Sequence, residues 1–191
     1  MNETQPLTDA EKMILLRLAR QTIERVVNGQ SMLPLKLDDY SPSLRENGAS
    51  FVTLTEDDDL RGCIGALEPF QPLVQDVCEH AASAAIDDYR FQPVTPGEVA
   101  RLKIEISRLT PPQPFSYNQP TELITGLRPN VDGVIIRDGL HRATFLPQVW
   151  QKLPDPQAFL AHLCQKMGAP ANLWQRKPLQ VFTYQVEEFH E

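Results

Sequence analysis

The stretch LRGCIGAL (residues 60–67) combines residue types that could carry out nucleophilic chemistry. If this stretch is a β-strand, Arg61, Cys63 and Gly65 share one face, because successive side chains of a strand alternate. A neighbouring guanidinium favours the thiolate form of a cysteine. Glycines beside Cys63 let another group approach the backbone closely and leave its N–H donors accessible. A thiolate, a fixed cation and backbone donors are the parts of a nucleophilic or oxyanion-binding site.

A structural interpretation of the same stretch stays open. Two glycines also mark a β-bulge or a tight crossing, and Cys63 would then fill a space too small for a larger side chain. No histidine stands close to Cys63 in the sequence. A general base would therefore have to arrive through the fold, from His80, His141, His162 or His190.

Two further polar residues are candidates for this site. Glu105 lies on the polar side of an alternating segment, where it is either a solvated carboxylate or a proton carrier for Cys63. Gln148 stands among apolar residues in FLPQVW, so its amide needs a backbone or ligand partner. Trp150 and Trp174 are expected to pack in the core or at an interface between lobes rather than to stack on nucleic-acid bases.

The other two cysteines are expected to be buried. Cys78 and Cys164 each lie on the apolar stripe of a predicted helix, where free cysteine behaves as a small hydrophobe. The chain has no CxxC, HxxxH or HExxH spacing, so we predict no metal site. Its glycines fit neither a P-loop nor a dinucleotide fingerprint, and we predict no cofactor.

The elements that would position these residues can be read from the first half of the chain. FVTLT (51–55) and LRGCIGAL are expected to form two strands joined by the acidic turn EDDD. RLKIEISRL (101–109) alternates like a half-exposed strand, with Lys103, Glu105 and Ser107 on its polar face. Apolar periodicity predicts two helices, one beginning at a Thr8–Glu11 capping box and ending before Gly29, the other following Pro72.

The second half mixes strands and helices without a regular alternation. TELITGL (121–127) predicts a short helix, and GVIIRDGLHRATF (133–145) predicts a hairpin with a type I′ turn around Asp138-Gly139. Asp155 is expected to cap a helix that ends at Gly168, and LQVFTYQVEEF (179–189) is expected to form one strand. The segment QSMLPLKLDDYSPSLRENGAS (30–50) is rich in turn-forming residues and is expected to be an ordered loop. This order predicts an α+β fold with a mostly antiparallel sheet and flanking helices.

Composition excludes several functional classes. A net charge of −7 and a pI near 5.1 provide no broad field for a polyanion, so we predict no generic nucleic-acid binding. Only a small local patch could hold a specific RNA substrate. The chain lacks the roughly 20 continuous apolar residues of a membrane span, and its beginning does not resemble a secretory signal. With three cysteines, we predict a cytoplasmic protein without a disulfide framework.

Several motifs in order resemble the AMMECR domain family, known in prokaryotes as AmmeMemoRadiSam system protein A. They are GASFVTL, LRGCIGAL, RFQPVTPGEVARLKIEISRLTPP, RPNVDGVIIRDG and RATFLPQVWQKLPDPQAFLAHLCQKMG. LRGCIG is the signature hexapeptide of that family, and residues 60–65 match it position by position. Further matches are Glu105, Asp132, Arg142, Pro147 and Gln148. The chain departs from the family segment AAF-DPRF, having Ile86 and Tyr89 where Phe and Pro are common.

The resemblance implies a single AMMECR domain over residues 1–191, made of two unequal lobes with a cleft between them. The larger lobe would be built from both chain ends around an antiparallel sheet, and the smaller lobe from a middle segment. The candidate catalytic residues are Arg61, Cys63 and Glu105. The candidate ligand-binding residues are Gly62, Gly65, Arg142 and Gln148.

Two functions from different classes follow. The resemblance implies partnership with a Memo-type protein and a radical SAM enzyme, in a pathway linked to base or RNA modification. In one hypothesis the protein is a non-catalytic adaptor that presents a ligand to these partners. In the other it is an enzyme or enzyme component that uses Cys63 as a nucleophile, Arg61 to lower its pKa and Glu105 to handle protons. The adaptor is favoured because the sequence does not assemble a complete acid–base set.

Overall fold

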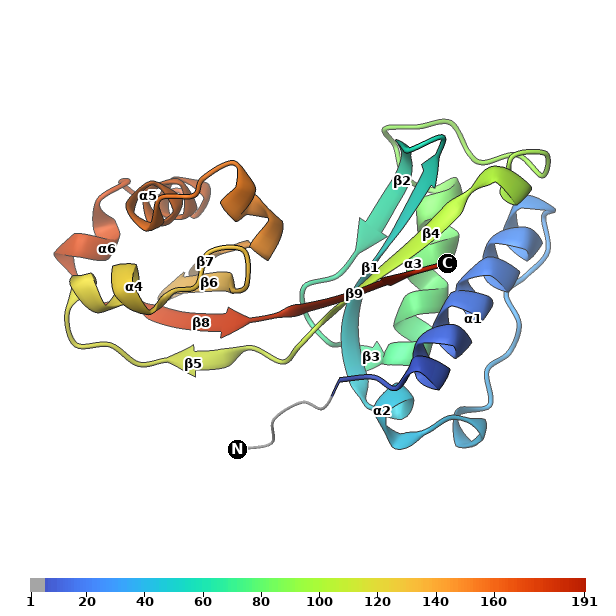
Figure 1. The fold of residues 1–191 in the computed structure, drawn as a ribbon, viewed down its shortest axis with the longest axis horizontal. Helices are drawn as coiled ribbons and strands as arrows, with labels where there is room; N and C mark the ends of the chain where they lie inside the picture. The colour runs from blue at the N-terminus through green and yellow to red at the C-terminus, as the bar shows by residue number, and fades with distance from the viewer. Residues whose placement is uncertain (1–5) are drawn as a thin grey trace. The chain divides into compact units, whose positions relative to one another are not determined.

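The computed structural model describes residues 6–191, and these form two compact units (Figure 1). The first unit contains the described residues up to Thr110 together with Glu187–Glu191. The second is the continuous segment Pro111–Val186. Both combine helices with antiparallel sheets, which confirms the predicted α+β class. Within the described residues, no helix has the length and apolar character needed to cross a membrane.

The first unit is a five-stranded sheet with helices packed against it. The strands run in the order β2-β1-β4-β9, and β3 also pairs with β1. The strands are β1 (Asn47–Glu56), β2 (Asp59–Gly65), β3 (Gln71–Pro72), β4 (Lys103–Leu109) and β9 (Val186–His190). The helices are α1 (Asp9–Val27), α2 (Pro42–Arg45) and α3 (Leu73–Ile86), with 3₁₀ turns η1 (Leu37–Asp39) and η2 (Val99–Arg101).

Helix α1 begins as the sequence predicts. Thr8 and Glu11 form the reciprocal capping box, and Gly29 follows the helix end with φ of +70°. Glu11 also accepts hydrogen bonds from the hydroxyls of Ser41 and Ser43. Although burial opposes it, these hydrogen bonds and those from Thr8 lower the pKa of Glu11 to about 2. The carboxylate therefore joins the start of α1 to the start of α2.

Strand alternation divides the sheet into a helix-facing side and an opposite side. Helices α1 and α3 lie side by side and pack on β1, β2 and β4 (Figure 1). The fully buried residues on that side include Val52, Leu54, Ile104 and Ile106. Alternate residues of β1 and β4 project to the opposite side, where most are partly exposed. Ala49, Ser107 and Leu109 are buried on that side, and Ser107 is the one of the three that the sequence predicts to be on the polar, half-exposed face.

The first hairpin follows the prediction in its turn and differs at its start. Asp57 and Asp58, the two residues between β1 and β2, both have positive φ, as a type I′ turn requires. Strand β1 begins at Asn47, earlier than predicted. Residues 30–50 contain η1, α2 and the start of β1, so the expectation of an ordered loop throughout this segment is wrong.

The second unit has its own sheet and core. Its strands run in the order β5-β8-β6-β7, and all the pairings are antiparallel. In the core, the rings of Trp150 and Phe159 stack with their centroids 3.7 Å apart. The strands are β5 (Gln113–Phe115), β6 (Gly133–Asp138), β7 (His141–Phe145) and β8 (Gln180–Tyr184). The helices are α4 (Pro120–Gly126), α5 (Pro156–Lys166), α6 (Leu173–Arg176) and the 3₁₀ turn η3 (Pro147–Gln151).

Two sequence predictions for this part of the chain are corrected. The last predicted strand is two strands, β8 and β9, which belong to different sheets. The β6–β7 turn is centred one residue later than predicted, on Gly139 and Leu140, because Asp138 pairs with His141. Gly139 has φ of +59° while Leu140 has no positive φ, which is the type II′ pattern rather than type I′.

Candidate functional site

The Cys63 side chain lies in a row of polar residues across three strands. Thr53 on β1 is paired with Cys63 on β2 and with Glu105 on β4. The Thr53 hydroxyl donates to Cys63 Sγ at 3.3 Å. All three residues are partly exposed on the side of the sheet opposite the helices. Because neighbouring strands are roughly 4.8 Å apart, the Cα atoms of Cys63 and Glu105 are about 10 Å apart. A direct proton transfer between them would need a bridging group.

The backbone of Cys63 is held by two side chains that follow α3. Strand β2 is the edge strand of its sheet. The Cys63 N–H donates to Asp88 Oδ2 at 2.9 Å, and Arg90 Nη2 donates to the Cys63 carbonyl at 3.0 Å. A carboxylate and a guanidinium thus supply the acceptor and the donor that a further strand would supply. This arrangement covers an edge that would otherwise be open to pairing.

Asp88 and Arg90 also bind each other, which fixes the two side chains that hold the Cys63 backbone. Arg90 Nη2 lies 2.6 Å from Asp88 Oδ2, and Arg90 Nε donates to Asp88 Oδ1 at 2.9 Å. These hydrogen bonds hold the pKa of the Asp88 carboxyl well below its usual range. The Cys63 N–H, a potential oxyanion donor, is therefore already bound to a carboxylate.

Arg61 contacts a different part of the chain from the one that the sequence predicts. Leu54 pairs with Gly62 and Thr55 with Leu60, so Arg61 is the extra residue of a β-bulge. Its Nε donates to Glu98 Oε1 at 2.9 Å. Its Nη1 and Nη2 donate to the backbone carbonyls of Gln92 (2.8 Å) and Pro93 (3.4 Å). The bulge directs the guanidinium to the segment that leads into η2.

Glu98 organises the turn that receives Arg61. Its carboxylate accepts hydrogen bonds from Arg61 and from both the hydroxyl and the backbone N–H of Thr95. These hydrogen bonds lower the pKa of Glu98 to about 2. The bond from Arg61 has the largest effect, and those from Thr95 follow. Arg61 and Glu98 thereby anchor the clamp segment, which we define as residues 87–102, to β2.

The two glycines of the signature have packing roles. A Cβ built on Gly62 would lie 2.1 Å from the backbone oxygen of Ala84, because α3 approaches β2 closely there. A Cβ on Gly65 would lie 2.4 Å from the ring of Phe51. The close approach that the glycines predict thus involves segments of this chain. Their contact with a ligand stays a prediction.

Within the first unit, neither His80 nor Cys78 forms a hydrogen bond with Cys63. His80 Nδ1 lies 3.1 Å from Asp76 Oδ2, and the same carboxylate atom accepts a hydrogen bond from the Ser50 hydroxyl at 2.6 Å. The remaining histidines, at positions 141, 162 and 190, are exposed. Cys78 and Cys164 are buried as predicted, and burial raises the pKa of both thiols. Within the described residues, no group of three His, Cys, Asp or Glu could hold a metal ion.

The remaining candidates, Arg142 and Gln148, belong to the second unit. Arg142 is on β7 opposite Arg137, and Gln148 is exposed on η3. Asp132 is buried and binds the guanidinium and the backbone N–H of Arg128. Its carbonyl accepts the Trp150 Nε1 hydrogen bond at 2.7 Å, so Asp132 has a structural role in its own unit.

Comparison with known proteins identifies the family. The sequence model named AMMECR1 matches residues 16–189. The chain belongs to the AMMECR1 family. A protein of Methanothermobacter thermautotrophicus is 38% identical over 187 residues, which are 97% of each chain. Protein MJ0810 of Methanocaldococcus jannaschii is 36% identical over 192 residues, covering 97% of this chain and 92% of the relative.

A solved structure agrees with the AMMECR1 fold. The crystal structure of uncharacterized protein PH0010 from Pyrococcus horikoshii matches with a TM-score of 0.79 and 35% sequence identity. The match covers 97% of this chain and 93% of that one. These comparisons support the sequence-based assignment to the family and its α+β fold. The names of these relatives and of the solved structure specify neither a reaction nor a binding partner.

Sequence reasoning missed the residues that hold the AMMECR1 signature in place. Asp88, Arg90 and Glu98 bind β2, and Thr53 binds Cys63 Sγ. A signal for two of them was present, since Asp88 and Arg90 stand at the Asp and Arg of the family segment AAF-DPRF.

Proposed function

We propose that this AMMECR1 protein is a non-catalytic adaptor whose signature hexapeptide fixes the clamp segment as a docking surface. The observation that supports the proposal is that the Arg61 side chain and the Cys63 backbone both form hydrogen bonds with the clamp segment. Among residues 6–191, all hydrogen bonds of the Arg61 side chain go to the clamp segment, and the Cys63 N–H and carbonyl bind Asp88 and Arg90. Groups that could activate a nucleophile are instead committed to positioning this segment.

The clamp segment presents an aromatic residue suited to binding a protein. Tyr89 is 93% exposed, and it stands between Asp88 and Arg90, whose side chains bind β2. Exposed tyrosines held on an ordered backbone are frequent anchors of protein interfaces. The proposed partners are the Memo-type protein and the radical SAM enzyme that the family resemblance implies, acting in the cytoplasm in base or RNA modification.

The experiment measures binding between purified proteins. The wild-type chain is titrated with the Memo-type protein and, separately, with the radical SAM enzyme from the same organism by calorimetry. We expect Tyr89→Ala to weaken binding of one partner about tenfold or more, because a central aromatic contact is lost. Cys63→Ser should bind like the wild type. The control is Leu140→Ala, which alters an equally exposed residue of the second unit. Unchanged binding by Tyr89→Ala would contradict the proposal.

A second candidate function, nucleophilic chemistry at Cys63, rests on a different observation. Cys63 is partly exposed, and its sulfur accepts a hydrogen bond from Thr53 at 3.3 Å, in the same row as Glu105. A hydroxyl donor stabilises a thiolate more than a thiol. Since Arg61 is bound to Glu98, this candidate would depend on Thr53 and on charge supplied by a substrate or a partner.

Alkylation of the native protein distinguishes the two candidates. Iodoacetamide is applied from pH 5 to pH 9, and the modified cysteines are mapped by mass spectrometry. Cys78 and Cys164 serve as internal controls because both are buried. Fast labelling of Cys63 at pH 6, where an ordinary thiol is almost fully protonated, would favour the enzyme. Labelling of Cys63 that rises only near pH 8 to 9 would favour the adaptor.

A further inference from the structure

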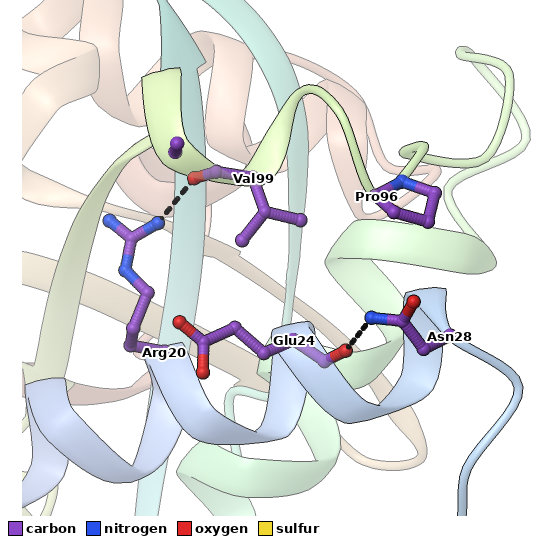
Figure 2. Close-up of a pocket in the computed structure, with 6 residues that line it drawn as sticks. Arg20, Glu24, Asn28, Pro96 and Val99 are labelled. Carbon is purple, nitrogen blue, oxygen red and sulfur yellow. Dashed lines mark hydrogen bonds between the residues drawn. The ribbon is translucent and has the colours of Figure 1, made fainter.

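A cavity between α1 and the clamp segment has no role in either candidate function. Its volume is about 420 Å³, within the range of small-ligand pockets. Arg20 and Glu24 of α1 and its C-cap Asn28 form one wall, and Pro96 and Val99 lie across from them (Figure 2). Ala100 also lines the cavity. We propose that this cavity binds an alkylguanidinium group, the chemical group of an arginine side chain or of agmatine.

The positive charge in the cavity wall is already neutralised. Arg20 Nη1 donates to the Val99 carbonyl at 2.6 Å (Figure 2). Its Nη2 donates to the Leu102 carbonyl at 2.7 Å. Its Nε and Nη2 also bind the Glu191 carboxylate. These bonds hold α1 against η2, and they leave little donor capacity for a bound anion.

The negative charge in the wall is available. Glu24 lies one helical turn from Arg20 and one turn from Asn28, so all three share a face of α1. Glu24 is exposed, and its carboxylate has no hydrogen bond or ion pair with another described residue. Asn28 Nδ2 donates to the Glu24 carbonyl at 2.7 Å, which fixes the amide and keeps its Oδ1 as an acceptor. The polar wall therefore offers oxygen acceptors and one net negative charge.

The opposite wall suits the hydrocarbon part of the ligand. Pro96, Val99 and Ala100 present only apolar side chains. Arginine side chains pack their methylene stem on such surfaces while the guanidinium binds oxygen acceptors. A guanidinium carries a planar set of donors that matches a carboxylate and sheds water more readily than an ammonium, so it fits this combination better than a lysine amine.

The test is a titration of the ¹⁵N-labelled full chain followed by NMR. The ligands are agmatine and capped arginine (Nα-acetyl-arginine amide), with capped citrulline as a neutral isostere. We expect saturable shifts at α1 and η2 with a Kd of about 1 mM or tighter for a guanidinium, and none for citrulline. If capped arginine binds at least as well as agmatine, the natural source is a polypeptide side chain. If only agmatine binds, the source is a free alkylguanidine.

Variants make the result specific to the cavity. Glu24→Gln keeps the shape of the side chain but removes its charge, and we expect about tenfold weaker binding or more. Ala100→Leu fills the cavity and should also weaken binding. The control is Asp9→Asn, on the same helix and about 22 Å away along its axis. The proposal is overturned if neither guanidinium gives saturable shifts at these residues, or if Glu24→Gln binds them like the wild type.

Discussion

At the scale of single residues, the signature is explained mainly by what lies against its backbone. Gly62 is placed where α3 comes close to β2, and Gly65 where the Phe51 ring covers the strand. Cys63 stands between them with its backbone bound to Asp88 and Arg90. The same hexapeptide thus joins a helix, a neighbouring strand and the clamp segment, with a different residue serving each contact.

Gly62→Ala should therefore destabilise the protein. The added Cβ would lie 2.1 Å from the Ala84 backbone oxygen, which cannot rotate away as a side chain could. We expect a loss of about 2 kcal/mol in the free energy of unfolding, typical of an overpacked core. Urea denaturation monitored by circular dichroism measures it. Gly97→Ala is the matched control, because nothing lies within 4 Å of its added Cβ, and it should stay within about 1 kcal/mol of the wild type.

At the scale of elements, the clamp segment binds the edge strand β2 at a position where no further strand of the described chain pairs with it. The Cys63 N–H of that strand donates to Asp88, and the Cys63 carbonyl accepts a hydrogen bond from Arg90. The adjacent bulge turns Arg61 toward Glu98 and the carbonyls of Gln92 and Pro93. Strand, bulge and clamp segment therefore form one hydrogen-bonded assembly.

Asp88→Ala should open that assembly locally. It removes the acceptor of the Cys63 N–H and the carboxylate partner of Arg90. We expect amide hydrogen exchange at Cys63 to become about tenfold faster or more, because a hydrogen bond to a charged group is lost. Exchange measured by NMR should change little at Ile106 in β4, which is a core strand. Equal exchange at Cys63 in variant and wild type would show that Asp88 does not protect the edge.

The Arg61–Glu98 contact should make stability depend on acidity. Because its folded pKa of about 2 lies below the ordinary value of 4.5, Glu98 stabilises the fold fully above pH 4.5. That contribution is lost as the pH falls from 4.5 toward 2. We expect Glu98→Gln to be less stable at pH 7 and to lose less stability on acidification than the wild type does. Denaturant unfolding at pH 7, 4.5 and 3 checks this, and parallel pH profiles would contradict it.

At the scale of the whole molecule, the sequence predicts elements better than it predicts their partners. Hydrophobic periodicity and caps locate α1, α3 and α5, because these signals are local. The division of the last strand into β8 and β9 depends on which sheet each half joins, and no local pattern records that. The direction of the Arg61 side chain likewise depends on a β-bulge, which arises from the register in which β2 pairs with β1. The sequence singled out Arg61 and Cys63 and predicted that they lie side by side, whereas the Arg61 guanidinium binds Glu98. The catalytic and ligand-binding roles of the candidate residues stay predictions.

Each unit has its own buried core, which leads to a prediction about cooperativity. Both tryptophans, Trp150 and Trp174, are buried in the second unit, so tryptophan fluorescence reports on that unit alone. Far-ultraviolet circular dichroism also reports on α1 and α3 of the first unit. Because Gly62→Ala strains only the first unit, we expect its circular dichroism midpoint to fall while its fluorescence midpoint stays near that of the wild type. If both midpoints fall together, the units unfold as a single cooperative structure.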